Sequence, residues 1–337
     1  MAKITAWAAK RAGGPLEPNE YEAGPLGPEE VELAVDHCGI CHSDLSMLNN
    51  EWGMTAYPFV PGHEAIGRVT ALGAQVKGLQ LGQRVGLGWT ASSCMHCRQC
   101  LSGDQHLCVS AQGTIIGRPG AFANRVRAHW AWVMPIPEAL DAGSTGPLLC
   151  GGITVFAPLL VFDVKPTQRV GVVGIGGLGH MALMFANAWG CEVTAFTSSP
   201  SKEGEARKLG AHNVVSSTDP DAMRSIAGTL DLVLDTVNVP LDWEALMATL
   251  APKGRLHVVG AVLEPIPVAA MTLIMGQRSV SGSPTGSRSA IDSMLGFAAR
   301  HKVAPQVEHY PMSKVNEAME RLASGKARYR VVLDSAQ

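Results

Sequence analysis

Two different rhythms of hydrophobic and polar positions divide the chain near residue 150. In the first part, short apolar or alternating pieces such as residues 31–35, 66–70 and 82–88 are bounded by Gly and Pro, and no long amphipathic pattern occurs before residue 140. Short β-branched runs between turn residues are typical of strands. The first part is therefore predicted to be β-rich, and a barrel-like sheet fits the pattern.

Beyond residue 150, apolar strand-like runs alternate with helical patterns. An apolar run at 169–173 leads through a glycine-rich turn into a helical pattern over 178–189. This alternation is typical of βαβ units, whose parallel strands need crossover connections. It continues with strands at 192–196, 212–215, 232–235 and 255–259, and with helices at 202–209 and 243–250. A helix over 312–324 and a strand over 328–333 follow, and the pattern does not indicate on which domain they pack.

Composition limits the class of protein. At ~150 residues per domain, 337 residues predict about two domains, and 46% apolar against 17% charged residues argues against disorder. A net charge of −2 argues against a partner made of nucleic acid. The most apolar stretch, 148–162, is shorter than the ~20 residues of a membrane span and predicts a buried helix. With no signal-peptide pattern at the start, we expect a cytoplasmic protein without membrane contact, whose thiols bind metal or react.

The glycine-rich turn has the spacing of a dinucleotide-binding loop. Gly174, Gly176 and Gly179 match G-x-G-x-x-G between a predicted strand and a predicted helix, which is the context that the motif requires. There the backbone approaches a pyrophosphate, and the helix N-terminus attracts its charge. An ordinary βα turn is the alternative. The predicted cofactor loop comprises Gly174, Gly176, Gly177, Leu178 and Gly179.

The end of the second strand indicates which dinucleotide binds. An NAD site usually carries Asp or Glu there, whereas this chain has hydroxyl groups and a cation at Thr197, Ser198, Ser199 and Lys202. A 2′-phosphate accepts hydrogen bonds from such groups, so we predict a preference for NADPH. A polar loop that caps the next helix near Ser199 is the alternative, and the two roles are compatible. The cofactor site is further expected to include Thr154, Thr236, Val259 and Gly260.

Four of the eight cysteines are close together in the sequence. Four thiolates at such spacing suit tetrahedral zinc in a lobe too small for its own core. An iron–sulfur cluster, a redox loop and chance clustering are alternatives, although the last spacing is longer than in the clustered ferredoxin motif. His96 and His106 lie in the same lobe and could replace a thiol. The predicted structural zinc ligands are Cys94, Cys97, Cys100 and Cys108.

The other four cysteines are dispersed. Cys41 and His63 lie in Gly-bounded turns, and Cys150 lies beside two glycines. A catalytic zinc gathers ligands from distant positions, but a lone buried Cys or His is more often part of the core. From spacing alone, a second metal site and core packing remain equal alternatives, and Cys38 and Cys191 are expected to be buried thiols.

Several segments together resemble the zinc-dependent alcohol dehydrogenases of the medium-chain dehydrogenase/reductase superfamily, above all the branch of the cinnamyl alcohol dehydrogenases and bacterial NADPH-dependent aldehyde reductases. Besides the four-cysteine lobe, the matching segments are CGICHSD at 38–44, YPFVPGHE at 57–64, LLCGGIT at 148–154, VGIGGLGH at 173–180 and RYRVV at 328–332. The resemblance implies an α/β protein with two domains. The GroES-like catalytic domain comprises residues 1–150 and 300–337, with the zinc lobe at about 90–110. It is interrupted by a Rossmann NADP-binding domain, residues 151–299, which has a doubly wound parallel sheet.

The same resemblance implies roles for individual residues. Cys41, His63 and Cys150 correspond to the ligands of a catalytic zinc, and Glu64 to a glutamate that can approach the metal. Asp44 corresponds to the carboxylate that orients the ligand histidine. Ser43 corresponds to the hydroxyl that passes the alcohol proton, while Ser46 stands where many relatives have a histidine that continues this relay. Two zinc ions per chain are implied.

The implied activity is the reversible reduction of aldehydes to primary alcohols, with hydride from NADPH to a zinc-polarised carbonyl and proton delivery through Ser43. Trp52 and Trp89 are candidates for the substrate wall or, alternatively, for the core, and Pro284 stands where relatives place an aromatic pocket residue. The alternatives are an NAD-linked polyol or sugar dehydrogenase, a zinc-free quinone reductase, and a zinc-lobe binding module. Relatives are often dimers joined through their Rossmann domains, so a homodimer is expected.

Overall fold

The computed structural model describes residues 3–335, which form two compact units. One unit extends up to Ile153 and resumes at Gly286, and the other comprises Thr154–Thr285. The second unit is thus an insertion in the first. The return occurs earlier in the chain than the boundary expected at residue 300, because α10 (Arg288–His301) belongs to the first unit. An amphipathic pattern gives a helix one apolar face but does not identify the surface on which that face packs.

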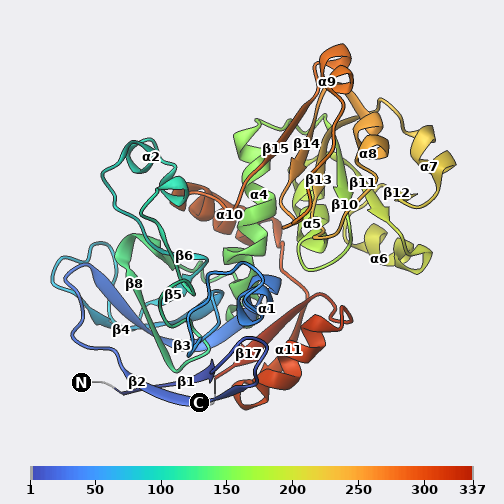
Figure 1. Ribbon diagram of the computed structural model, residues 1–337. Coiled ribbons are helices and arrows are strands. Elements are labelled where there is room, and N and C mark those ends of the chain that lie inside the picture. Colours follow the sequence, from blue (N-terminus) through green and yellow to red (C-terminus); the bar gives the residue numbers. More distant parts are fainter. Residues whose placement is uncertain (1–2, 336–337) are drawn as a thin grey trace. The chain divides into compact units, whose positions relative to one another are not determined.

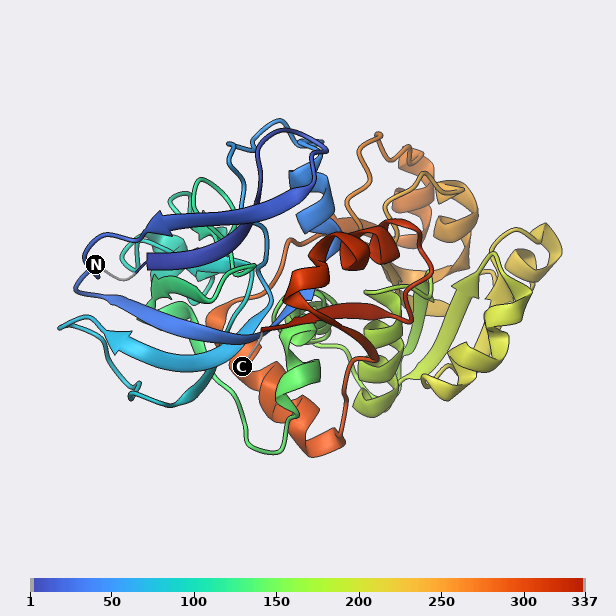
Figure 2. The ribbon, with the colours of Figure 1, turned by 90° about the horizontal axis from the view of Figure 1, so that it is seen from below.

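The first unit is built around a largely antiparallel sheet (Figure 1). Its strand order is β16-β17-β3-β4-β5-β9, and β8 also pairs with β3. Two two-stranded sheets, β1-β2 and β6-β7, complete the β-structure, and Figure 2 shows β1 and β2 side by side. The strands are β1 (Lys3–Ala9), β2 (Leu16–Glu22), β3 (Glu30–Ile40), β4 (Ala65–Leu72), β5 (Arg84–Leu87), β6 (Thr90–Ser92), β7 (Gln112–Gly113), β8 (Arg125–His129), β9 (Val133–Pro135), β16 (Val307–Pro311) and β17 (Arg330–Asp334).

The helices of the first unit are short, apart from α10. Before residue 140 the longest described helix is α1, with seven residues, which confirms the expectation of a β-rich first part. In α11, Val315, Ala318 and Met319 are buried in the core, the i, i+3, i+4 spacing of one helix face. The remaining elements are α1 (His42–Leu48), α2 (Arg98–Leu101), η1 (Gln105–Leu107), η2 (Trp130–Trp132), α3 (Ala142–Thr145), η3 (Gly146–Leu149), η5 (Met312–Lys314) and α11 (Val315–Ala323).

The second unit has a sheet of six parallel strands in the order β12-β11-β10-β13-β14-β15. This is the doubly wound order of a Rossmann fold. Successive strands are added toward one edge from β10 to β12 and toward the other edge from β13 to β15, and such folds bind ligands at this switch point between β10 and β13. The predicted Rossmann domain is thereby confirmed. Its elements are β10 (Arg169–Val173), α5 (Gly179–Trp189), β11 (Glu192–Thr197), η4 (Pro200–Lys202), α6 (Glu203–Lys208), β12 (Asn213–Ser216), α7 (Pro220–Ser225), β13 (Leu230–Asp235), α8 (Trp243–Thr249), β14 (Leu250–Val258), α9 (Ala270–Gly276) and β15 (Ser279–Gly282).

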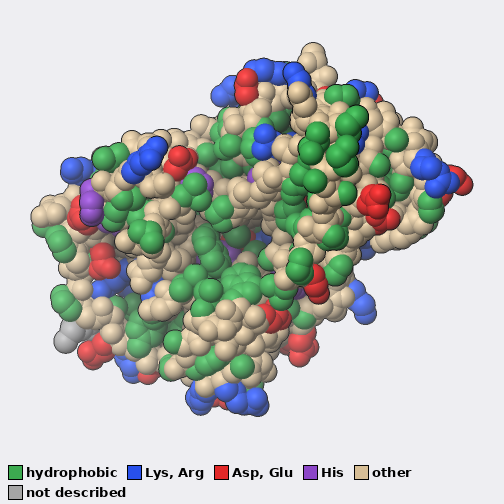
Figure 3. All heavy atoms as spheres, turned by 45° about the horizontal axis from the view of Figure 1, so that its top comes forward, with side chains coloured by type: hydrophobic (Ala, Val, Ile, Leu, Met, Phe, Trp, Pro, Cys, Tyr) green, Lys and Arg blue, Asp and Glu red, His purple; other side chains and the backbone are tan. Residues whose placement is uncertain are grey.

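The apolar stretch at 148–162 contains α4 (Gly151–Val161), which is buried through Leu159, as predicted. Among residues 3–335, no single helix combines the length and apolar composition of a membrane span, and one helix pair bent by 55°, Ala142–Leu149 with Gly151–Val161, passes that test jointly. On the face drawn in Figure 3, Lys and Arg side chains are interspersed with Asp and Glu, so this face carries no broad positive field.

Candidate active site and metal centres

Two thiols, an imidazole and a carboxylate converge in the first unit from three separate segments. Cys41 precedes α1, His63 and Glu64 precede β4, and Cys150 lies between η3 and α4. His63 Nε2 is 3.3 Å from Cys150 Sγ, and the sulfur atoms of Cys41 and Cys150 are 3.8 Å apart. One ligand atom from each of the four lies within 4.8 Å of the others, and all four residues are buried. We call these four residues the buried cluster.

Asp44 holds the parts of the buried cluster in position. Its Oδ1 lies 3.0 Å from His63 Nδ1 and accepts the Gly62 N–H at 2.8 Å, while its Oδ2 accepts the Cys41 N–H at 2.9 Å. Because a carboxylate only accepts here, the His63 proton is on Nδ1, and the Nε2 lone pair faces the thiols. This is the orientation that a metal-binding histidine needs.

Glu64 is paired with a buried cation that the sequence analysis did not assign to the site. Arg330, on β17, donates from Nη2 to Glu64 Oε1 and also to the Ile40 carbonyl at 3.2 Å. Burial raises the pKa of Glu64 to about 7, although the charge of Arg330 opposes this shift. A Cβ on Gly39 would lie 2.0 Å from Glu64 Oε2, so a larger residue at that position would displace the Glu64 carboxylate. A charged residue inside an apolar strand needs a partner, and this was the available sequence signal for Arg330.

The donor set of the buried cluster fits a zinc ion. Zinc prefers Cys, His and carboxylate ligands in tetrahedral geometry, and catalytic sites combine three protein ligands with one exchangeable position. A hydrogen bond from Cys150 holds the pKa of the Cys41 thiol well below its usual value despite burial. Glu64 Oε2 is buried without a hydrogen-bond partner, and a metal ion bound beside it would satisfy this oxygen.

Ser43 and the two predicted tryptophans lie beside the buried cluster. Ser43, on α1, has its Oγ 3.8 Å from Cys41 Sγ. The Trp89 ring meets His63 edge-on at 5.0 Å, and Trp52 meets Trp89 in the same manner at 6.2 Å. Both tryptophans are half-buried and also pack against the core, so their wall and core interpretations are compatible.

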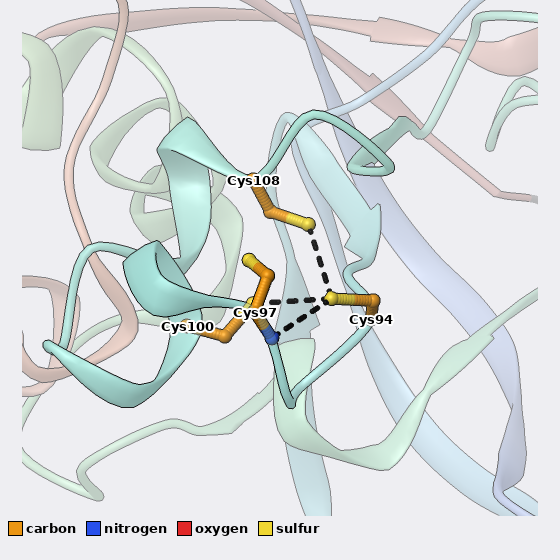
Figure 4. Close-up of side chains that lie close together, drawn as sticks. All are labelled: Cys94, Cys97, Cys100 and Cys108. Atoms are coloured by element: carbon orange, nitrogen blue, oxygen red, sulfur yellow. Dashed lines mark hydrogen bonds between the residues drawn. The ribbon is translucent and has the colours of Figure 1, made fainter.

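The four clustered cysteines converge around one point in the loop between β6 and β7, as Figure 4 shows. We call the segment that carries them, residues 94–108, the cysteine lobe. Cys94 Sγ lies 3.5 Å from Cys108 Sγ and 3.9 Å from Cys100 Sγ, and all four sulfur atoms are within 4.8 Å of one another. Backbone N–H groups of His96 and Cys97 lower the pKa of the Cys94 thiol to about 6, which favours the thiolate that binds metal.

These separations match one tetrahedral ion. Zn–S bonds of about 2.3 Å place sulfur atoms roughly 3.8 Å apart, which is the scale observed here. His96 directs its Nδ1 to the Cys94 carbonyl at 2.6 Å, and neither His96 nor His106 belongs to the converging group. All eight cysteines are free of disulfides. The lobe therefore offers four thiol ligands.

In the second unit, a cavity of about 520 Å³ opens at the carboxyl ends of β10, β11 and β13. Gly176 faces open space, so a ligand can approach its backbone, whereas a Cβ on Gly179 would lie 1.9 Å from the Gly174 carbonyl. Glycine is thus required at 179 for close packing and at 176 for access. The predicted cofactor residues that line the cavity are Gly174, Gly176, Thr197, Ser198, Ser199, Lys202 and Thr236.

The side chains at the end of β11 are arranged without a capping role. Ser199 stands at the N-cap of η4, but its side chain makes no capping hydrogen bond and instead lies 2.9 Å from Ser201 Oγ. Lys202 Nζ donates to the Ile175 carbonyl at 3.1 Å, which holds its charge at the cavity. The capping alternative for Ser199 is therefore wrong.

Some predicted cofactor residues do not line the cavity, and some lining residues were not predicted. Thr154 donates to the Pro284 carbonyl at 3.3 Å, and a Cβ on Gly260 would lie 1.7 Å from the Val237 carbonyl, so Gly260 is needed for packing. Gly177, Leu178, Gly179 and Val259 also lie outside the lining. The unpredicted lining residues include Ser217, Thr218 and Val239, on loops that carry no motif.

Comparison with known families matches both units. Residues 27–138 match the family described as alcohol dehydrogenase GroES-like domain, and residues 177–300 match the family described as zinc-binding dehydrogenase. Aldehyde reductase AdhA of Synechocystis sp. is 52% identical to this chain over 334 residues, covering 99% of each protein.

Solved structures show the same similarity. A cinnamyl alcohol dehydrogenase from Sorghum bicolor superposes with a TM-score of 0.95 at 38% identity, covering 99% of this chain and 98% of that one. A cinnamyl alcohol dehydrogenase from Helicobacter pylori, complexed with NADP(H), gives a TM-score of 0.91 at 28% identity with the same coverage.

Proposed function

Because the chain belongs to the zinc-binding alcohol dehydrogenases of the medium-chain dehydrogenase/reductase superfamily, in their cinnamyl-alcohol-dehydrogenase-like branch, we propose that it reduces aldehydes to primary alcohols, reversibly, with NADPH and zinc. Oxidoreduction of alcohols and aldehydes follows from the family. The use of NADPH, the presence of zinc and the roles of individual residues are what we propose beyond that.

The observation that carries the proposal is the buried cluster. Cys41, His63 and Cys150 would hold the ion, with Glu64 as an additional carboxylate within reach. When bound there, zinc supplies Lewis-acid polarisation of a carbonyl oxygen and stabilises the negative charge that develops on it.

The neighbouring residues orient groups and move a proton. Asp44 keeps the His63 proton on Nδ1 and fixes the ring. The Ser43 hydroxyl, next to Cys41, gives a proton to the product oxygen and recovers it from solvent. Trp89 packs edge-on against His63 and Trp52 packs against Trp89, so aromatic surface lies beside the buried cluster, which favours an apolar substrate and excludes water.

The preference for NADPH rests on the cavity in the second unit. Ser198, Ser199 and Lys202 offer hydroxyl groups and a positive charge at the end of β11, where a 2′-phosphate would need them. The Helicobacter pylori relative binds NADP(H), which supports the same preference here. Replacement of Lys202 by Ala should lower the ratio of kcat/KM for NADPH over NADH by about tenfold, the scale of one charge-assisted hydrogen bond.

We further assign a structural zinc ion to the cysteine lobe, which makes two ions per chain. The four thiols lie within a short loop of small strands and turns, where a metal replaces the missing core. Neither the predicted substrate wall nor Ser43 belongs to this lobe, so its metal contributes stability rather than chemistry.

The edge of the second unit supports the proposal of a homodimer. β15 is an outer strand of the six-stranded sheet, and the backbone groups along its outer edge are open to pairing. Exposed apolar side chains accompany it: Met271, Ile274 and Met275 on α9 and Val280 on β15. A second copy of the chain, joined strand to strand through β15, would cover them.

A kinetic panel combined with metal analysis tests the proposed function. Aliphatic and aromatic aldehydes, their alcohols and a polyol are assayed with NADPH and NADH, and zinc per chain is measured. We expect aldehydes with NADPH to give the highest kcat/KM and about two zinc ions per chain. Faster polyol oxidation with NAD, or full activity in zinc-free protein, would contradict the proposal.

A further inference from the structure

A third group of metal-ligating side chains uses none of the residues assigned above. Within residues 3–335, three groups of His, Cys, Asp and Glu place their ligand atoms within 4.8 Å of one another, and the third consists of His37, His309 and Asp334. His37 is on β3, His309 on β16, and Asp334 is the last residue of β17. All three belong to the first unit.

The register of the sheet holds these three residues together. Asp334 is directly opposite His37 in the antiparallel pair β3-β17. In the parallel pair β16-β17, Asp334 is opposite Pro311, which is two residues after His309. Residues that are directly opposite, or two positions along a neighbouring strand, share one face of a sheet. The backbone ladder therefore places both imidazoles next to the carboxylate.

Both histidines direct the same nitrogen to this carboxylate. His37 Nδ1 is 2.7 Å from Asp334 Oδ1, and His309 Nδ1 is 3.0 and 3.1 Å from the two Asp334 oxygens. The two rings meet at 79° with centroids 6.3 Å apart. The three side chains are between 28% and 40% exposed, so water and ions reach them.

A second carboxylate and a glycine border His309. A Cβ at Gly143 would lie 3.0 Å from His309 Cε1, so glycine leaves room for the ring. The same point is 3.4 Å from Asp141 Oδ2, which places a further negative charge on this side of the ring. The negative charges near His309 favour a cation in this location.

The donor set is one that transition metals prefer. Imidazole nitrogen and carboxylate oxygen suit zinc, nickel and copper ions. Bonds of 2.0–2.2 Å at tetrahedral angles place ligand atoms roughly 3.3–3.6 Å apart, so small side-chain shifts from the 2.7–3.1 Å between each imidazole nitrogen and Asp334 would accommodate an ion. Transfer of the proton of each neutral imidazole from Nδ1 to Nε2 frees the Nδ1 lone pair for the metal. We propose that His37, His309 and Asp334 form a solvent-accessible site for a divalent transition metal ion, with water in the remaining position.

The test is a titration of the intact, zinc-replete protein with Zn²⁺. The resident zinc is measured first, and the uptake beyond it is followed by calorimetry. We expect one further equivalent in the unmodified protein. Loss of a supporting contact alone weakens metal sites 10–100-fold, so His309→Ala and Asp334→Asn should each weaken this uptake by at least about tenfold.

The matched control is His301→Ala, which removes another histidine of the same unit, stacked on Phe297 at the end of α10. This variant should retain the further equivalent. Melting temperature without added zinc and kcat/KM verify that the variants are folded and that the resident sites are intact. No uptake beyond the resident zinc, or equal uptake by His309→Ala and unmodified protein, would overturn the proposal. Either result would leave the proposed aldehyde reduction untouched.

Discussion

The buried cluster and the cysteine lobe are both sets of four converging ligands, but they are built in opposite ways. The lobe takes four thiols from one loop, with Cys94 and Cys97 only half-buried. The buried cluster takes three kinds of donor from three distant segments, and it is surrounded by the charges of Asp44 and Arg330. With the proposed zinc ions, the lobe would depend on its ion for shape, whereas the fold already holds the residues of the buried cluster together.

The contrast between the two sites indicates where function can be expected. A mixed donor set, an adjacent hydroxyl and a buried carboxyl with a raised pKa are together typical of a catalytic site. A closed four-thiolate site has no position left for a substrate. The following four changes test this contrast, and the largest effect comes first.

Replacing Cys41 by Ser should remove activity while leaving a folded protein. The polarising metal is worth several kcal/mol, so kcat should fall by at least about a thousandfold. NADPH binding, measured by nucleotide fluorescence, should be unchanged, because the cavity in the second unit contains no part of the buried cluster. Cys191→Ser, at a buried thiol of the second unit, is the control and should retain activity. Unimpaired turnover of Cys41→Ser would refute the catalytic assignment.

Replacing Arg330 by Met should reduce stability strongly. The change leaves Glu64 buried without its cation, which typically costs about 3–5 kcal/mol. Urea unfolding measures the loss. Arg98→Met, at an exposed arginine within the cysteine lobe, should stay within about 0.5 kcal/mol of the unmodified protein. If Arg330→Met lost no more free energy of unfolding than Arg98→Met, the pairing of Arg330 with Glu64 would not stabilise the buried cluster.

Replacing Cys97 by Ser should affect stability and not catalysis. Loss of a structural metal is among the few causes of large destabilisation, so the free energy of unfolding should fall by about 3 kcal/mol. One zinc ion per chain should be lost. At 25 °C the folded fraction should keep its kcat. A melting temperature equal to that of the unmodified protein would remove the case for a metal in the lobe.

Replacing Asp44 by Asn should have the mildest effect. The amide oxygen still accepts a hydrogen bond from His63, but the charge that orients the ring is lost and the amide nitrogen cannot accept from the Cys41 N–H. Such supporting contacts are worth about 10–100-fold in metal affinity. Competition with a chelator should therefore remove one zinc ion more readily. Asp104→Asn, in the lobe, is the control with no expected change. If the chelator removes both ions at unchanged rates, Asp44 has no orienting role.

The local features of both regions could be predicted from the sequence. The run 169–173 coincides with β10 because a short β-branched segment before a glycine turn has few other ways to fold. The cysteine lobe is readable because its ligands are neighbours in the chain. Cys41, His63 and Cys150 needed the family resemblance, because their spacing alone is compatible with core packing.

Features that depend on long-range pairing could not be predicted. β2, β15 and β16 were not predicted, because they contain few apolar residues and are defined by their partners in the sheet. The role of Arg330 requires β17 to pair with β3, some 290 residues away in the sequence. The packing of α10 on the first unit, across an inserted domain, is of the same kind.

The pairing of β3 with β17 has a consequence for the order of events during synthesis. The ribosome makes β3 early but cannot supply β17 until the whole second unit has been translated. The second unit is continuous in the chain, so its parallel sheet can form first. Until then Glu64 has no counter-charge, and the nascent first unit presents open strand edges. The first unit is therefore completed only after the second unit, which carries the predicted cofactor loop, has been synthesised.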